Sequence, residues 1–278
     1  MEIIKNRCSV RSYSKNRISE ETKKKLMKYA NSIKGPFYSK VRLEFIDSYD
    51  ILQKSEGKIG TYGIIKDAQH FIVSIVKDEE NNLMQLGYIL EKLILYATSL
   101  GLGTCWMGGT FKRSDFAKFV HLGEGETLPI VTPIGYPQEK RSVVDNFMRY
   151  AAGSNQRKSW KELFYDESII VPLELDDSNE YAEALEAVRL APSASNKQPW
   201  IIIKKNDTYS FYLKQNKRYA EGLGFNIQEI DMGIAMCHFE MVLQEKGIKG
   251  FWRVENLQEE NPNFEGLTYC VSWIEASE

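Results

Sequence analysis

The stretch that decides the fold of this 278-residue chain reads Leu190-Ala191-Pro192-Ser193-Ala194-Ser195-Asn196-Lys197-Gln198-Pro199-Trp200. An apolar-periodic segment with Leu185 and Val188 precedes it and the β-rich run Trp200–Ile203 follows it, so it joins a predicted helix to a predicted strand. Its two prolines fix backbone angles and remove donors, while its serines, asparagine and glutamine offer hydrogen-bonding groups. The stretch is therefore either an ordinary polar connection or a stiffened loop that holds a ligand.

A second motif lies near the N-terminus and reads Arg7-Cys8-Ser9-Val10-Arg11-Ser12-Tyr13. It is followed by Ile18-Ser19-Glu20-Glu21 and a helical run that reaches Ala30. The planar guanidinium of arginine suits both phosphate oxygens and carbonyl groups, and such charge-assisted bonds are stronger than neutral ones. Taken alone, the motif is either an anion-binding element or a basic, solvated arm.

Together the two motifs resemble the A-P-S-x-x-N-x-Q-P-W and R-x-S-x-R-x-Y signatures of the nitroreductase family of FMN-dependent oxidoreductases. The resemblance implies an α+β, nitroreductase-like fold and an FMN site, which in this family lies between two identical subunits. It assigns cofactor binding to one set of residues from each motif: Arg7, Cys8, Ser9 and Arg11 from the first, and Pro192, Ser193, Ser195, Asn196 and Gln198 from the second.

A third segment, Gly103-Thr104-Cys105-Trp106-Met107-Gly108-Gly109, resembles the family element whose backbone lies against the reactive N5 edge of the flavin. The absence of a Cβ lets a glycine approach a flat ring closely and present its N–H. The resemblance thus adds Met107, Gly108 and Gly109 to the cofactor site. Many family members carry a side chain where this chain has Gly108, which removes any substrate contact made by that side chain.

A fourth segment, Pro133-Ile134-Gly135-Tyr136-Pro137, resembles the closing G-Y-P element of the family, after which basic residues bind the phosphate. The resemblance gives that role to Lys140 and Arg141. Gly57–Gly63 also looks like a family loop, in which Tyr62 could stack on a ligand or simply pack.

The chain contains an internal repeat. When Gln85-Leu86-Gly87-Tyr88 is placed on Asp231-Met232-Gly233-Ile234, Gly101-Leu102 falls on Gly247-Ile248. Both copies predict a helix that ends at a glycine, Leu86–Leu100 with apolar residues nearly all round and Ile230–Leu243 with a narrow apolar stripe. Because the helix precedes Gly101-Leu102-Gly103, these glycines do not form a dinucleotide-binding fingerprint.

Each copy has lost one motif. The first has Asn31–Phe37 where the polar loop belongs, and the second has the acidic Glu174–Glu180 where the arginine motif belongs. This resembles the family branch with two fused nitroreductase-like halves, the TM nitroreductase type. We expect residues 1–165 and 166–278 to form pseudo-symmetric halves with one composite FMN site, and the chain to be a monomer with an internal pseudo-dimer. The apolar run Ile169–Val171 predicts a packed crossing segment between them.

The predicted strands share β-branched or aromatic residues bounded by turn residues. In the first half they are Val41–Ile46, Phe71–Val76 and Pro129–Ile134, and in the second Trp200–Ile203, Tyr209–Leu213 and Thr268–Ile274. Strands mixed with longer helices favour the α+β class, with a mainly antiparallel sheet and central helices in each half.

Composition excludes several classes of function. A net charge of −2 gives no general attraction to nucleic acid or anionic membranes, and no run of apolar residues is long enough to span a bilayer. The N-terminus lacks the apolar stretch of a secretory signal, so we expect a cytoplasmic protein. Four scattered cysteines and three histidines show no metal-ligand spacing, and neither a G-x-S-x-G elbow nor a P-loop is present.

The resemblance implies ping-pong chemistry at flavin N5. NADH or NADPH would deliver a hydride, and a small-molecule electron acceptor such as a nitro compound or quinone would then remove it, with no catalytic side chain required. Two alternatives stay open: a protein that stores or senses FMN without turnover, and a family member with other flavin chemistry such as reductive dehalogenation.

Overall fold

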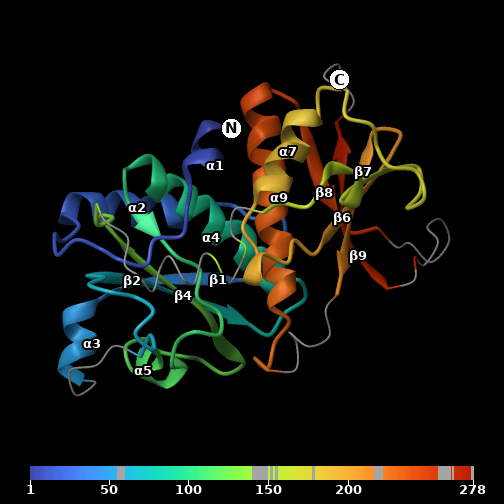
Figure 1. The fold of residues 1–278 in the computed structure, drawn as a ribbon. Helices are drawn as coiled ribbons and strands as arrows, with labels where there is room; N and C mark the ends of the chain where they lie inside the picture. Colours follow the sequence, from blue (N-terminus) through green and yellow to red (C-terminus); the bar gives the residue numbers. More distant parts are fainter. Residues whose placement is uncertain are drawn as a thin grey trace. The chain divides into compact units, whose positions relative to one another are not determined.

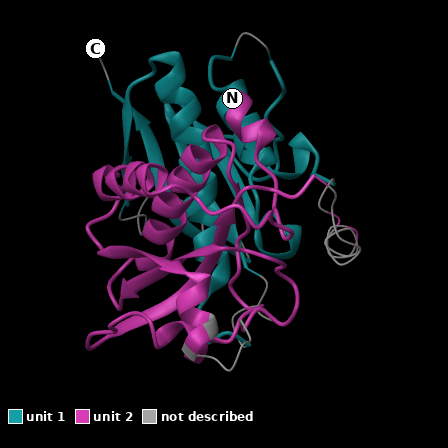
Figure 2. Cartoon of the chain, turned by 90° about the vertical axis from the view of Figure 1, so that its left-hand side faces the viewer, with its two compact units in different colours: residues 1, 155–278 teal, residues 2–154 magenta. Residues whose placement is uncertain are grey.

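The computed structural model describes residues 1–54, 60–139, 150, 153, 156–176, 179–215, 222–255, 264 and 266–276. The chain divides into an N-terminal unit, residues 2–154, and a C-terminal unit, residues 155–278 together with Met1 (Figure 2). The sequence places this division at 165/166. The chain joins the C-terminal unit earlier because Arg157 and Lys158 hydrogen-bond to Asn196 and Gln198. Strand β5, Phe164–Asp166, then pairs with strand β6, Trp200–Lys205.

The N-terminal unit is built on a four-stranded antiparallel sheet with the order β1-β2-β4-β3. All three strands predicted in this half are confirmed, each slightly longer than expected, while the short β3 was not predicted. The strands are β1 (Val41–Asp47), β2 (His70–Lys77), β3 (Gly103–Thr104) and β4 (Glu126–Gly135). Strand β2 is buried along its length except at Lys77, so both of its faces are covered.

Helices cover both faces of this sheet (Figure 1). On one side lie α2 (Glu20–Ser32) and α4 (Asn82–Ser99), and on the other α3 (Ser48–Lys54) and α5 (Arg113–Ala117), while α1 (Glu2–Asn6) begins the unit. The Ser19 side chain caps α2 by accepting from the Thr22 N–H. Helix α4 is buried nearly all round and is followed by Gly101 at φ +74°, which confirms the predicted central helix and its glycine end.

The C-terminal unit repeats this topology. Its sheet has the order β5-β6-β7-β9-β8, so β6, β7, β9 and β8 take the places of β1, β2, β4 and β3. The strands are β6, β7 (Thr208–Lys214), β8 (Gly250–Arg253) and β9 (Leu267–Glu275), all antiparallel, and β5 adds one parallel strand. The three strands predicted in this half are confirmed, and β5 and β8 were missed.

Helices α7 (Ala182–Leu190) and α9 (Ile227–Lys246) lie side by side against this sheet (Figure 1). Helix α9 ends at Gly247, at φ +77°, as predicted. The predicted narrow stripe is wrong, because α9 is buried on nearly all sides, including Gln228, Asp231 and His238. A hydrophobic pattern counts such polar residues as exposed, yet each can be buried once it has a partner, as His238 Nδ1 has in the Ala187 carbonyl at 3.0 Å.

The segment after β5 differs from its prediction. Ile170 is 85% exposed and Val171 is also exposed, so the apolar run does not pack as a buried crossing strand. The chain turns back on itself, with the Asp166 N–H donating to the Val171 carbonyl at 2.8 Å and Tyr165 bridging to Pro172. The apolar residues therefore lie at the tip of a tight turn, where side chains point outward.

His70 predicts a pH-dependent stability of the N-terminal unit. It is fully buried at the start of β2, and its Nε2 accepts a hydrogen bond from the Ile18 N–H at 3.2 Å. Burial, followed by the charges of Lys23 and Arg17, lowers the pKa of His70 to about 4. In the unfolded chain the pKa of His70 is near its ordinary value of 6.5, so this histidine binds a proton more readily there than in the folded protein. Its contribution to stability is therefore complete above pH 6.5 and falls as the pH drops toward 4.

We expect a loss of about 3 kcal/mol across this window, measured by urea unfolding at several pH values. His70→Gln should flatten the dependence, and His121→Gln, at an exposed histidine, should keep it. Identical slopes in all three proteins would show that other groups cause the loss.

Candidate functional site

Three of the motifs found in the sequence meet in the N-terminal unit. The arginine motif runs beside β3, where Ser9 bridges to Thr104 and the Val10 N–H donates to the Thr104 carbonyl at 2.8 Å. Tyr13 is buried, and its hydroxyl donates to the carbonyls of Val10 at 2.6 Å and Pro133 at 3.2 Å. The motif thus lies between the glycine-rich segment after α4 and the G-Y-P segment at the end of β4, which are distant in sequence.

Arg7 has a buried partner that the sequence did not predict. Its Nε lies 3.7 Å from Glu91 Oε1 of α4, and the two side chains are only 8% and 0% exposed. The indole N–H of Trp106 donates to Glu91 Oε2 at 2.8 Å. Glu91 therefore offsets the charge of Arg7 and links it to the glycine-rich segment. Cys8, Ser9 and Arg11 are half-buried.

The glycine-rich segment is fixed by β4. Met107 is buried and exchanges two backbone hydrogen bonds with Val131, at 3.2 and 3.0 Å. The Gly108 carbonyl accepts from the Arg113 guanidinium at 2.8 Å, whereas Gly109 is exposed. Of the remaining predictions for this unit, Lys140, Arg141 and residues 57–59 lie outside the described residues, and Tyr62 is exposed, which does not support packing.

The polar loop of the C-terminal unit is strained. It contains the short 3₁₀ helix η2, Ala194–Asn196, and three non-glycine residues in the left-handed region: Ser195 at φ 47°, Asn196 at φ 55° and Gln198 at φ 47°. Each such residue costs about 1–3 kcal/mol and persists only where its surroundings fix it, and such residues gather at functional sites. The loop is therefore an ordered element rather than a simple connection.

Residues 156–158 fix the loop, and the sequence did not predict their role. The Arg157 guanidinium donates to Asn196 Oδ1 at 2.9 Å, and Asn196 Nδ2 donates to the Gln156 carbonyl at 2.8 Å. The Lys158 N–H donates to Gln198 Oε1 at 2.9 Å, and its ammonium donates to the Gln198 carbonyl at 3.0 Å. Two adjacent cations before Ser159 were the available signal, but nothing local shows that they reach a loop far along the chain.

These contacts change the predicted distribution of charge. The sequence places the phosphate-binding cations only in the first half, whereas Arg157 and Lys158 bring positive charge to the polar loop of the second. Burial, then Lys214, lowers the pKa of Lys158. Ser193 Oγ accepts from the Gln198 N–H at 2.8 Å, and Pro192 and Ser193 are half-buried while Ser195 is exposed.

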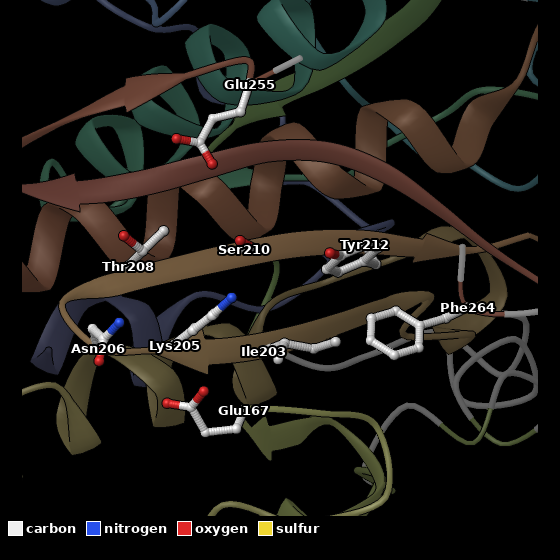
Figure 3. Close-up of a pocket in the computed structure, with 9 residues that line it drawn as sticks. All are labelled: Glu167, Ile203, Lys205, Asn206, Thr208, Ser210, Tyr212, Glu255 and Phe264. Carbon is white, nitrogen blue, oxygen red and sulfur yellow. The ribbon is translucent and has the colours of Figure 1, made fainter. Parts of the chain in front are cut away.

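A cavity of about 280 Å³ opens on the C-terminal unit, over β6 and β7 (Figure 3). Its walls include Ile203, Lys205, Ser210 and Tyr212, and burial raises the pKa of Tyr212 to about 12. None of the predicted site residues lines it. Within the described residues, no group of three or more His, Cys, Asp or Glu side chains could hold a metal ion.

Comparison with known proteins shows the family and the fold. A family model with the description "Putative TM nitroreductase" matches residues 1–243. The structure of a "putative nitroreductase" from Thermotoga maritima, 18% identical, covers 98% of this chain and 92% of its own, with a TM-score of 0.61. The fold is thus nitroreductase-like, as predicted. No curated protein matches the sequence.

Two further structures match about half of this chain. A nitroreductase with bound FMN from Bacteroides fragilis is 18% identical and covers 51% of this chain and 90% of its own, with a TM-score of 0.42. An FMN-dependent nitroreductase from Clostridium difficile is 21% identical and covers 50% and 88%, with a TM-score of 0.40. Among the described residues, no helix has the length and apolar character needed to cross a membrane.

Proposed function

Because the chain belongs to the TM nitroreductase family, we propose that it is an FMN-dependent NAD(P)H oxidoreductase that reduces a small-molecule acceptor. The observation that carries the proposal is the polar loop Pro192–Gln198, held in a strained conformation by Arg157 and Lys158, which lie far from it in sequence. Strain of this kind is typical of a loop shaped in advance for a ligand. The resemblance of this loop and of the R-x-S-x-R motif to signatures of FMN-dependent nitroreductases supports the choice of cofactor.

The residues present fit FMN in charge and in hydrogen bonding. A phosphate dianion needs cationic, directional donors, and Arg7 of the N-terminal motif is such a donor. The carbonyl-rich ring edge needs donors, and the loop offers backbone N–H groups and the side chains of Ser193 and Asn196. Since the loop and the R-x-S-x-R motif occur once each in the sequence, we propose that the chain binds one FMN, with Lys140 and Arg141 as further phosphate ligands.

FMN, when bound, would supply the hydride-transfer chemistry between NADH or NADPH and the acceptor. The protein's part is to bind and orient. Gly108 and Gly109 would lie near N5, and Arg11 would offset negative charge on the ring, as donors fixed in advance do. The buried Met107 holds the glycine segment to β4 and gives it little freedom to move. No acid–base side chain is assigned, and the chain is proposed to work as a cytoplasmic monomer.

The proposal predicts one FMN per chain. Protein purified with FMN and freed of excess should release about one equivalent on acid treatment, and NADH or NADPH should bleach its visible absorbance under anaerobic conditions. Arg157→Ala should weaken FMN binding more than tenfold, because it removes a charge-assisted bond worth about 1.5–3 kcal/mol that shapes the loop. Lys161→Ala, at an exposed lysine nearby in sequence, is the matched control.

Three results would contradict this proposal in different ways. If the protein binds no flavin, the proposed function is wrong. Two equivalents of FMN would contradict a single FMN site in the chain. Bound FMN that neither nucleotide reduces would favour a protein that stores or senses FMN.

A further inference from the structure

Asp231 is a buried acid that the proposed chemistry does not use. It lies in the first turns of α9 and is 3% exposed. Its Oδ1 accepts a hydrogen bond from the Ala194 N–H at 2.9 Å, at the point where η2 begins. Its Oδ2 is buried without a hydrogen-bond partner among the described residues. Burying a carboxyl group in this position costs free energy that an apolar side chain would not cost. Its presence therefore indicates a task that an apolar side chain cannot perform.

The internal repeat gives Asp231 a counterpart. In the repeat, Asp231 falls on Gln85, which is equally buried in α4. Gln85 Oε1 accepts from the Phe37 N–H at 2.9 Å, and its Nε2 donates to the Phe37 carbonyl at 2.7 Å. Phe37 lies in the connection from α2 to β1, and Ala194 lies in the connection from α7 to β6. The same helix position thus holds the same connection in both units.

The two units use this position differently. The amide of Gln85 bonds both the N–H and the carbonyl of Phe37, and the connection that contains Phe37 carries no A-P-S-x-x-N-x-Q-P-W motif. Asp231 instead provides one acceptor at the start of the turn whose next two residues, Ser195 and Asn196, are left-handed. Because this acceptor is fixed on a helix, it satisfies the first N–H of the turn and keeps the turn from relaxing to a less strained backbone conformation.

We propose that Asp231 is the positioning residue that fixes the polar loop for its cofactor, and that Gln85 fixes only the fold of the other connection. The cofactor part of this proposal rests on the proposed function, whereas the loop part does not. Burial raises the pKa of Asp231 well above its ordinary value. Asparagine keeps an oxygen acceptor of the same shape, so it should replace Asp231 as the acceptor for the Ala194 N–H.

The experiment compares three full-length variants: Asp231→Ala, Asp231→Asn and Gln85→Ala. Hydrogen–deuterium exchange of the peptide containing Ala194 reports on the loop without flavin, and fluorescence titration with FMN reports on binding. In Asp231→Ala we expect exchange to be about tenfold faster and FMN affinity about tenfold weaker, the effect of one lost buried hydrogen bond. Asp231→Asn should stay within about threefold of wild type in both measurements.

Gln85→Ala separates positioning from general loosening. It removes buried hydrogen bonds of the same kind, so it should speed exchange at Phe37 and leave FMN affinity unchanged. Unchanged exchange at Ala194 in Asp231→Ala would overturn the proposal, and so would equal FMN losses in Asp231→Ala and Gln85→Ala. If wild type binds no FMN, the proposed function fails, and the exchange data still decide the role of Asp231 in the loop.

Discussion

Replacing Arg7 with methionine should destabilise the N-terminal unit by about 3–5 kcal/mol, because it removes the cation that lies beside the buried carboxylate of Glu91. Glu91 is fully buried, and its other oxygen already accepts from Trp106. Methionine is chosen because it fills a similar space with no charge. Urea unfolding followed by tryptophan fluorescence and circular dichroism measures the loss.

The double variant Arg7→Met/Glu91→Gln separates two roles of Arg7. Glutamine keeps an acceptor for the Trp106 indole and removes the buried negative charge, so at least half of the lost stability should return. If Arg7 also binds the flavin, FMN affinity should stay weak in the double variant. A double variant no more stable than Arg7→Met would show that the buried charge is not the cause of the loss.

Replacing Phe239 with alanine should destabilise the C-terminal unit by about 3–5 kcal/mol, the range for large-to-small changes at a buried aromatic residue. Phe239 of α9 is fully buried, and its ring centroid lies 5.4 Å from that of Phe211, 5.6 Å from that of Tyr209 and 6.0 Å from that of Trp273. These rings attach the helix to β7 and β9, so a cavity here weakens the whole unit.

Phe251→Ala is the matched control, because Phe251 lies in β8 of the same unit and is 47% exposed. A surface change of this kind should shift stability by no more than about 0.5 kcal/mol. Equal losses in the two variants, measured by the same unfolding experiment, would mean that the aromatic cluster does not form the core of this unit.

The strands and helices could be predicted from the sequence wherever the local pattern is strong. The six predicted strands are present because runs such as Phe71–Val76 carry β-branched and aromatic residues between turn residues. The short strands β3, β5 and β8 escaped because two to four residues carry no periodicity, and pairing with a neighbour defines them. The burial of polar residues in α9, such as His238, was also missed, because a contact with another segment allows it and the local pattern does not show that contact.

The sequence by itself determined which segments carry the candidate site: the polar loop after α7, the arginine motif, the glycine-rich segment and the duplicated helices. These are local patterns of residue type and spacing. Only the tertiary structure decided their partners, setting Glu91 against Arg7, residues 156–158 around Asn196 and Gln198, and Asp231 under Ala194. Contacts between residues far apart in sequence depend on how helices and strands pack, and no local pattern records them. The left-handed residues of the loop follow from those contacts, since only fixed surroundings make such a conformation stable.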